Sequence, residues 1–135
     1  MKPSTPVRFH SGMAGLDAGA WNRLAGDYPF LRYEFLAALE DTGCVTAATG
    51  WTPHHLQLGS SQQPQVLAPM YEKAHSWGEF VFDFAWARAW ESRGLKYYPK
   101  LLLAIPFTPA TGPRLLCADS TTSAGVNGIA SSSFG

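Results

Sequence analysis

The sequence lacks the cysteine pattern of a disulfide-bonded or zinc-binding protein. Its two cysteines, Cys44 and Cys117, stand far apart, whereas such proteins carry several cysteines or histidines at short, regular spacing. His54 and His55 are adjacent, so as strand residues they would point to opposite faces and could not easily share one metal ion. A site that combines one of them with His75 is an alternative without ligand spacing to support it. We therefore expect no metal site.

The sequence also lacks an excess of charge of either sign. Ten basic residues balance ten acidic ones, so no overall field favours nucleic acid or an anionic membrane surface. The lysines and tyrosines between Lys96 and Lys100 form too small a patch to indicate nucleic-acid binding. Any partner must be recognised locally.

Long apolar runs are missing as well. The run Leu101–Ile105 is too short to span a membrane, and the N-terminus has no apolar segment of the kind found in secretory signals. Motifs for dinucleotides, for a phosphate-binding loop, for a nucleophilic serine and for a zinc protease are absent too. These absences predict a cytoplasmic protein without a membrane span.

Local signals predict a strand and a helix near the N-terminus. Val7 to Phe9 can form a short first strand. Asp17 is a good helix N-cap, and Leu16 before it can pack on Trp21, four residues into the helix. Gly26 is expected to end this helix.

A second helix and a hairpin are expected next. Pro29 suits the first turn of a helix that runs to Gly43. Its apolar residues share one stripe, formed by Leu31, Phe35, Leu36, Ala38 and Leu39. From Gly50 the period changes to two, and alternating apolar residues flank the polar loop GSSQQP. This pattern predicts a β-hairpin with Leu56 and Leu58 on one strand and Val66, Ala68 and Met70 on the other.

The stretch from His75 to Pro109 has the highest aromatic density of the chain. Phe82, Trp86 and Trp90 recur at helical spacing, which predicts a helix over Phe82–Arg93 with these rings on its buried face. Gly94 supplies the stop. Leu101–Ile105 then reads as one buried strand. Together the elements predict an α/β (α+β) fold.

Three polar residues of this stretch are candidates for a site. His75, Glu79 and Asp83 are each four residues apart, so on an early-starting helix they would form a polar stripe over two turns. The alternative is structural: His75 and Ser76 cap the segment, and the two acids favour the positive end of the helix dipole.

The character of the sequence changes after Pro109. Residues 1–116 are expected to form one folded unit. Residues 117–135 are rich in Ser, Thr, Gly and Ala without apolar periodicity. Such a composition buries too little apolar surface to offset the entropy of ordering, so we expect Asp119–Gly135 to be disordered or draped on the surface.

Several phrases of the chain resemble a known family. PFLRYEFLAALEDTG, TGWTPHHL, KAHSWGEFVFDFAWARAW, GLKYYPKLLLAIPFTP and TGPRLL occur in the same order in the N-terminal part of predicted bacterial N-acyltransferases related to the FemAB peptidoglycan-bridge enzymes and the GNAT superfamily. The resemblance covers about residues 7–116. It implies a partial GNAT-like mixed sheet with flanking helices, and transfer of an acyl group from coenzyme A or aminoacyl-tRNA to an amine on a small molecule or peptide.

The resemblance also points to site residues. The phrase KAHSWGEFVFD offers His75 or Glu79 as the base that frees the amine, and YYPK offers groups that could polarise or orient the acyl group. The expected substrate contacts are Lys73, Ser76, Asp83, Tyr98 and Lys100. No cofactor is expected to bind to this chain itself, and the only nucleic acid implied is a tRNA that carries the donor.

The departures from the family pattern matter too. GNAT enzymes hold the coenzyme A pyrophosphate on a glycine-rich loop that leads into a helix, whereas Thr111–Arg114 contains a proline and no helix pattern follows. Members of the family are much longer, so we expect a truncated fragment that is inactive alone. A stand-alone module that binds a peptide or cell-wall precursor is the alternative. Truncation would leave Leu101–Ile105 as an open apolar edge that invites self-association.

Overall fold

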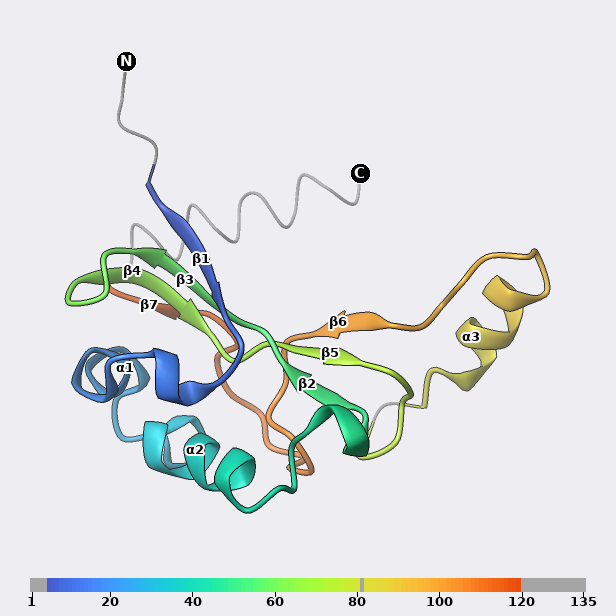
Figure 1. Cartoon of the computed structure of the whole chain (residues 1–135), viewed down its shortest axis with the longest axis horizontal. Coiled ribbons are helices and arrows are strands. Elements are labelled where there is room, and N and C mark those ends of the chain that lie inside the picture. The colour runs from blue at the N-terminus through green and yellow to red at the C-terminus, as the bar shows by residue number, and fades with distance from the viewer. Residues whose placement is uncertain (1–4, 81, 120–135) are drawn as a thin grey trace.

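The structure, a computed structural model, describes residues 5–80 and 82–119 (Figure 1). This part of the chain has an α+β fold, as the sequence predicts, and its strands form two antiparallel sheets. Short 3-10 turns occupy Met13–Gly15, Pro29–Leu31 and Ala47–Thr49. The helices are α1 (Ala18–Ala25), α2 (Tyr33–Asp41) and α3 (Phe84–Glu91), and the strands are β1 (Val7–His10), β2 (Trp51–Pro53), β3 (His55–Gly59), β4 (Pro64–Ala68), β5 (Tyr71–Lys73), β6 (Lys100–Leu102) and β7 (Leu116–Cys117).

The predicted hairpin forms the centre of the first sheet, whose strand order is β1-β3-β4-β7. Strands β3 and β4 pair with Leu58 opposite Val66 and Leu56 opposite Ala68, so the predicted hairpin forms. Leu56 and Leu58 are only half-buried, however, and the buried face of β3 carries Gln57, which lies opposite Leu67 of the main core. The predicted first strand is β1. Every strand pair in the described part of the chain is antiparallel, so the parallel neighbours that a mixed sheet requires are not among them.

Helix α1 follows its sequence signals closely. The Asp17 side chain accepts a hydrogen bond from the Ala20 amide at 2.6 Å, which satisfies one of the free donors of the first turn. Gly26 forms the C-cap with a positive φ of 61°. The helix therefore begins and ends where the cap and the glycine predict.

The second predicted helix is interrupted at Arg32, which is extended between the 3-10 turn and α2. The groups that a continuous helix would pair internally have tertiary partners here. The Trp21 indole donates to the Leu31 carbonyl at 2.7 Å, and the Tyr33 amide donates to the Asn22 side chain at 2.8 Å. These bonds compensate for the break, and they tie the chain after Pro29 to α1.

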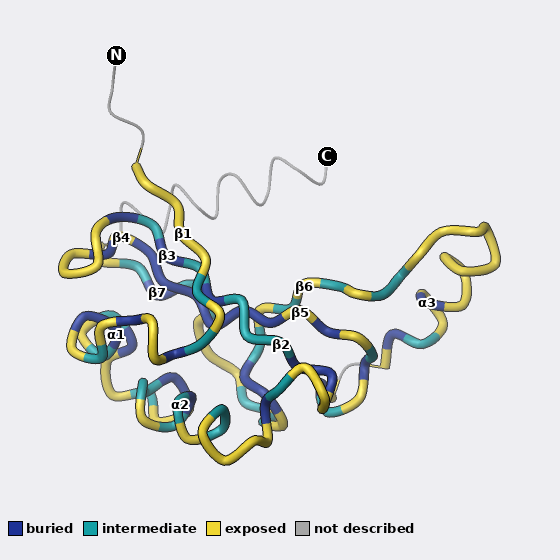
Figure 2. Tube along the Cα trace, viewed as in Figure 1, coloured by how far each residue is buried: buried dark blue, intermediate teal, exposed yellow. Residues whose placement is uncertain are grey.

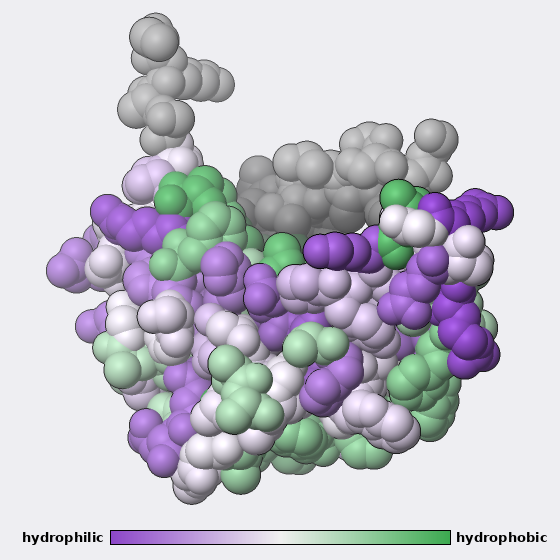
Figure 3. All heavy atoms as spheres, turned by 45° about the vertical axis from the view of Figure 1, so that its right-hand side comes forward, coloured by the Kyte–Doolittle hydropathy of each residue, from purple (hydrophilic) through white to green (hydrophobic). Residues whose placement is uncertain are grey.

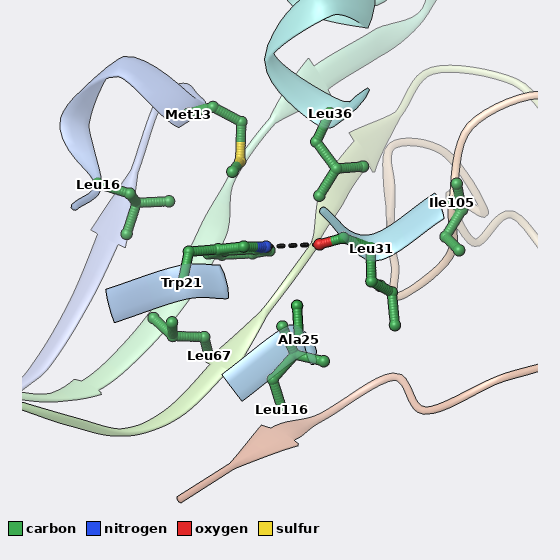
Figure 4. Close-up of a cluster of buried hydrophobic side chains, with 9 residues drawn as sticks. All are labelled: Met13, Leu16, Trp21, Ala25, Leu31, Leu36, Leu67, Ile105 and Leu116. Carbon is green, nitrogen blue, oxygen red and sulfur yellow. Dashed lines mark hydrogen bonds between the residues drawn. The ribbon is translucent and has the colours of Figure 1, made fainter. Parts of the chain in front are cut away.

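The main core lies between the first sheet and the two helices α1 and α2, which cover one of its faces (Figure 1). Trp21 is fully buried near its centre (Figure 4). Of the predicted α2 stripe, Leu31 and Leu36 are buried, whereas Ala38 is exposed. The buried members of this cluster are Met13, Leu16, Trp21, Ala25, Leu31, Leu36, Leu67, Ile105 and Leu116.

A buried histidine joins this core to the second sheet. The His55 Nδ1 accepts a hydrogen bond from the Met70 amide, so its Nε2 carries the proton and donates to Glu40 at 2.7 Å. The other Glu40 oxygen accepts from the Met13 amide at 2.8 Å. Burial, and the negative charge of Glu40, raise the pKa of the neighbouring Tyr71 hydroxyl. The His55–Glu40 pair connects α2, β3 and the first 3-10 turn, and we interpret this pair as structural.

The second sheet has the strand order β2-β5-β6 and packs around Trp51 and Tyr71. The prediction of a buried strand over Leu101–Ile105 was wrong. Strand β6 begins at Lys100 and lies at the edge of the sheet, where Leu101 is 57% exposed. The chain leaves the sheet after Leu102, and Ile105 is buried in the main core instead.

Residues 74–99 leave the second sheet as an arm that carries α3 and returns to β6 (Figure 1). The prediction of a buried face on this helix was also wrong: Phe82, Trp86 and Trp90 are 85%, 72% and 48% exposed. The arm extends past the edge of the sheet, and within residues 5–80 and 82–119 no layer covers those rings, so α3 is mostly exposed (Figure 2). Ala87 is the buried residue of α3. Periodicity places residues on one face, but it does not supply a partner for that face.

Candidate functional site

Most of the predicted site residues meet where the arm joins the second sheet. We call this group the Lys100 cluster. It brings together two acids, one lysine, one serine and two tyrosines, and its members are Ser76, Glu79, Asp83, Tyr97, Tyr98 and Lys100.

The ammonium of Lys100 is the hub of the cluster. Its Nζ donates to Ser76 Oγ and to Glu79 Oε2, each at 2.8 Å, and forms a short ion pair with Asp83 Oδ2. The Glu79 side chain is only 1% exposed, so this is a largely buried ion pair. Burial alone would lower the pKa of Lys100, but the hydrogen bonds to Asp83 and Glu79 raise it above its ordinary value. Lys100 is therefore a permanent cation at neutral pH.

Tyrosines complete the cluster. The Tyr97 hydroxyl donates to Asp83 Oδ2 at 2.7 Å, and this bond and burial raise the pKa of Tyr97. The Tyr98 hydroxyl lies 2.7 Å from Ser76 Oγ. Burial would raise the pKa of Asp83, but the bonds from Lys100 and Tyr97 outweigh it and lower that pKa to about 2. Asp83 thus stays ionised across the whole physiological range.

Lys73 lies beside the cluster because of the sheet register. It is directly opposite Lys100 in the β5–β6 pair, and directly opposite residues share a face of an antiparallel sheet. Its Nζ donates to the Trp77 carbonyl at 3.0 Å and lies 3.8 Å from the centre of the Trp51 ring. Burial lowers the pKa of Lys73 to about 8, although the charge of Glu79 opposes this shift. Lys73 is therefore the amine of this region that loses its proton most readily.

The lowered pKa of Lys73 predicts a pH dependence of stability. Its pKa is about 8 in the folded chain and 10.5 as the ordinary value, so between these pH values the unfolded chain binds more protons. The free energy of unfolding should therefore rise with pH across this window. We expect the native chain to gain stability relative to Lys73→Met between pH 7.5 and pH 10, as measured by urea denaturation of both. If the difference in the free energy of unfolding between the two proteins stays constant with pH, the prediction is contradicted. If that difference falls as the pH rises, the pKa of Lys73 is shifted in the opposite direction.

Two oxygen atoms of the cluster have no hydrogen-bond partner among residues 5–80 and 82–119. Glu79 Oε1 and Asp83 Oδ1 are buried side-chain oxygens without a hydrogen bond within the described part of the chain. An ionised carboxylate accepts several hydrogen bonds, and leaving an oxygen buried without one is costly. The two oxygens are therefore unsatisfied acceptors, and their charge favours a positively charged donor.

The structure corrects how these residues come together. Residues 74–80, 82 and 83 are not helical, so the predicted stripe of His75, Glu79 and Asp83 does not form. Glu79 and Asp83 meet through Lys100 instead. Asp83 precedes α3 but forms no side-chain cap, because its carboxylate binds Lys100 and Tyr97. The structural alternative is wrong for His75 and Ser76, because no helix begins there, but Asp83 is the N-cap residue of α3 and so does lie at the positive end of a helix dipole.

His75 is not joined to the Lys100 cluster by any hydrogen bond or ion pair of the described residues. Its Nδ1 accepts from the Trp77 amide at 3.2 Å, and its Nε2 packs on Gly50, where an added Cβ would lie 2.2 Å away. Gly50 also has a positive φ of 79°, so this contact depends on glycine. Of the two predicted bases, Glu79 is the one that the structure places in the cluster.

Tyr97 is the member of the cluster that the sequence analysis did not select. It stands beside Tyr98 in the YYPK phrase, and the two rings pack edge to face with their centres 5.0 Å apart. Nothing in the sequence indicates which of two adjacent tyrosines reaches an acid on another segment. What the sequence did indicate was that the phrase YYPK, residues 97–100, belongs to the site.

The sequence predicts neither a metal site nor a coenzyme A loop in this chain. Among residues 5–80 and 82–119, no three His, Cys, Asp or Glu side chains come together as metal ligands. Thr111–Arg114 is a loop, and the next element of the described chain is β7. The Arg114 guanidinium donates to the carbonyls of Gly112 and Ala110 at 3.0 and 3.1 Å, so it is engaged within its own loop. None of the helices described is both long and apolar enough to cross a membrane.

The fold and the cluster define the chain as an α+β protein with a buried ammonium–carboxylate site. Comparison with protein families gives a match over residues 12–132 to the FemAB-like family, described as peptidoglycan biosynthesis/recognition. The chain belongs to this family, as the sequence resemblance indicates. Comparisons with curated proteins and with solved structures gave no match.

Proposed function

We propose that the Lys100 cluster binds the acceptor amine in a peptidoglycan-related N-acyl transfer. The observation that carries this proposal is a pair of buried carboxylate oxygens, Glu79 Oε1 and Asp83 Oδ1, which have no hydrogen-bond partner in the part of the chain that the structure describes. A substrate ammonium supplies three hydrogen-bond donors and one positive charge, which is what two such oxygens require. The family supports a cell-wall peptide as the molecule that bears the amine.

Transfer needs a proton acceptor, because a protonated amine cannot attack a carbonyl carbon. Lys100 is held protonated by two carboxylates, so it is unsuited to this task. Glu79 would first take one proton from the ammonium and release it to solvent, which frees the nitrogen lone pair. As the nitrogen bonds to the acyl carbon it loses a second proton, which passes to the thiolate or alkoxide that leaves when the bond from the acyl carbon to the donor breaks. Lys73, with its lowered pKa, is a second acceptor within the same face of the sheet.

The donor in this proposal is an acyl thioester or an aminoacyl ester, as in acyl-CoA or aminoacyl-tRNA. The Thr111–Arg114 loop does not lead into a helix among the described residues, which favours a second reading of the same site: recognition of the amine without transfer. The chain would then act alone as a module that binds a peptide or cell-wall precursor. Both readings require amine binding, and a mass-spectrometric search for an acylated peptide separates them.

The proposal predicts that the chain binds a peptide through its lysine amine. The probe is a short fluorescent peptide with blocked ends and one lysine, and its matched control is the same peptide acetylated on that amine. We expect acetylation, or Glu79→Gln, to weaken binding by roughly tenfold or more, since each removes a charge-assisted hydrogen bond of about 1.5–3 kcal/mol. Fluorescence anisotropy measures the dissociation constant of the peptide in both comparisons.

A matched acidic residue controls for general charge effects. Glu72 is exposed on the neighbouring strand β5 and takes no part in the cluster, so Glu72→Gln should leave binding unchanged. Equal binding of the free and acetylated peptides would overturn the proposal. Circular dichroism of Glu79→Gln confirms that the variant compared is folded.

A further inference from the structure

A small apolar cavity adjoins the Lys100 cluster. Its volume is about 220 Å³, and its wall is built mainly from aromatic rings. A cavity of roughly 150 Å³ suffices to hold a benzene molecule, so this one accommodates a single ring or a short acyl chain. The residues that line it are Ser76, Trp77, Gly78, Phe80, Phe82 and Phe84.

The cavity and the acids come from one segment of the arm. Glu79 stands between Gly78 and Phe80, and Asp83 stands between two phenylalanines that line the cavity. Acids that bind Lys100 therefore alternate with rings that form the wall. Ser76 belongs to both, because it lines the cavity while its Oγ accepts from Lys100.

The rings of this wall are unusually exposed. Trp77 is 68% exposed and Phe82 85% exposed, and apolar patches interrupt the polar surface on this side of the molecule (Figure 3). Large apolar groups gathered at a surface indicate a binding site. The adjacent acids add charge complementarity for a cation, so the occupant carries both an apolar group and a positive charge.

We propose that the cavity binds the apolar group of a primary amine whose ammonium lies on Glu79 and Asp83. This inference rests on the proposed function and narrows its substrate class to amines with an apolar group of about the size of one ring. The ammonium end is oriented by the carboxylates. The apolar end then selects among amines, which the carboxylates alone cannot do.

Three small probes test the two halves of the site. 2-Phenylethylamine carries both groups, ethylamine lacks the ring, and 2-phenylethanol lacks the charge. We expect 2-phenylethylamine to bind at least tenfold more tightly than either of the others in a titration followed by NMR, since burial of one ring has an effect of that order. Equal binding of 2-phenylethylamine and ethylamine would overturn the inference and leave the amine site standing.

Two variants assign the effect to the cavity. Phe82→Ala removes an exposed ring of the wall and should reduce the advantage of 2-phenylethylamine over ethylamine without changing ethylamine binding. Trp90→Ala removes a half-exposed ring of α3 that does not line the cavity, and it should change neither. If both variants reduce the preference for 2-phenylethylamine over ethylamine equally, the assignment of the ring-binding site to this cavity is overturned.

A second copy of the chain is the rival occupant of the cavity. Strand β6 offers an open edge nearby, so self-association could cover the same rings. Light scattering at the concentrations of the titration shows whether a dimer forms. A dimer that dissociates as 2-phenylethylamine is added would still support the ligand site, whereas a dimer that excludes the probe would overturn it. Failure of every amine, the lysine peptide included, would reject the proposed function and this inference together.

Discussion

Lys100→Met is expected to lower the free energy of unfolding by about 3–5 kcal/mol, the range found when one partner of a buried ion pair is removed. The substitution keeps a side chain of similar length, so the packing volume changes little. What is lost is the ammonium that binds Glu79 Oε2, Asp83 Oδ2 and Ser76 Oγ. Two acids then stay buried without a cation. Urea denaturation at pH 7 measures the difference.

The loss should depend on pH in a defined direction. In the native chain the pKa of Asp83 is lowered to about 2 from an ordinary value of 3.8, so its stabilising contribution is present above 3.8 and lost as the pH falls toward 2. In Lys100→Met the part of this lowering that Lys100 causes disappears, so the acids take up protons more readily than in the native chain. The difference in the free energy of unfolding between the native chain and Lys100→Met should therefore become smaller toward acidic pH.

Two controls separate buried charge from other effects. Lys96→Met removes an exposed lysine of the same arm and should change stability by less than about 0.5 kcal/mol. Adding Glu79→Gln and Asp83→Asn to Lys100→Met replaces the whole ion cluster by neutral groups and should restore much of the loss. If Lys100→Met costs no more than Lys96→Met, the cluster is screened by solvent and its carboxylates are not the buried acceptors described above.

The elements that the sequence predicted well are those whose signals are local. Asp17 caps α1 with a bond that spans three residues, and Gly26 ends the same helix by its own backbone conformation. The β3–β4 hairpin follows from alternation over adjacent strands joined by a short polar loop. In each case the residues that decide the structure lie within a few positions of one another, so the chain needs no distant partner to form them.

The elements that were predicted wrongly depend on distant partners. The break at Arg32 follows from hydrogen bonds that Trp21 and Asn22 make to the chain around it. The aromatic face of α3 satisfies the helical period, yet nothing in the described structure packs over it. A periodic pattern reports which residues share a face, whereas burial depends on what lies opposite, and the period contains no information on that.

In the candidate site, too, local signals were predicted correctly and contacts between distant segments were not. Family phrases selected seven residues on β5, the arm and β6, and the structure joins five of them in the Lys100 cluster. The helical spacing used to join His75 with Glu79 and Asp83 was incorrect. The link between the acids is Lys100, which lies beyond α3 in the sequence. The opposition of Lys73 and Lys100 follows from a β5–β6 pairing across the whole arm, which no local pattern predicts.

Trp21→Ala is the core substitution with the largest expected effect. Trp21 is fully buried between the helices and the first sheet, and replacing a buried tryptophan by alanine costs about 3–5 kcal/mol through lost apolar contact and the cavity left behind. Its indole also donates to the Leu31 carbonyl at 2.7 Å, the bond that accompanies the break before α2 (Figure 4). The variant should therefore loosen the attachment of α2 as well as the packing of α1.

Trp21→Phe separates the two contributions of this side chain. It keeps an aromatic ring but leaves the Leu31 carbonyl without its donor, so we expect a loss of about 1–3 kcal/mol and less protection of the amides around Leu36 in hydrogen exchange. Trp90→Ala is the matched control, because that ring is 48% exposed and lies outside the core. If Trp90→Ala were as destabilising as Trp21→Ala, the aromatic face of α3 would be covered in solution, and the exposed arm described here would be an interface between molecules. Similar protection of Leu36 in the native chain and in Trp21→Phe would mean that the Leu31 bond does not hold α2 in place.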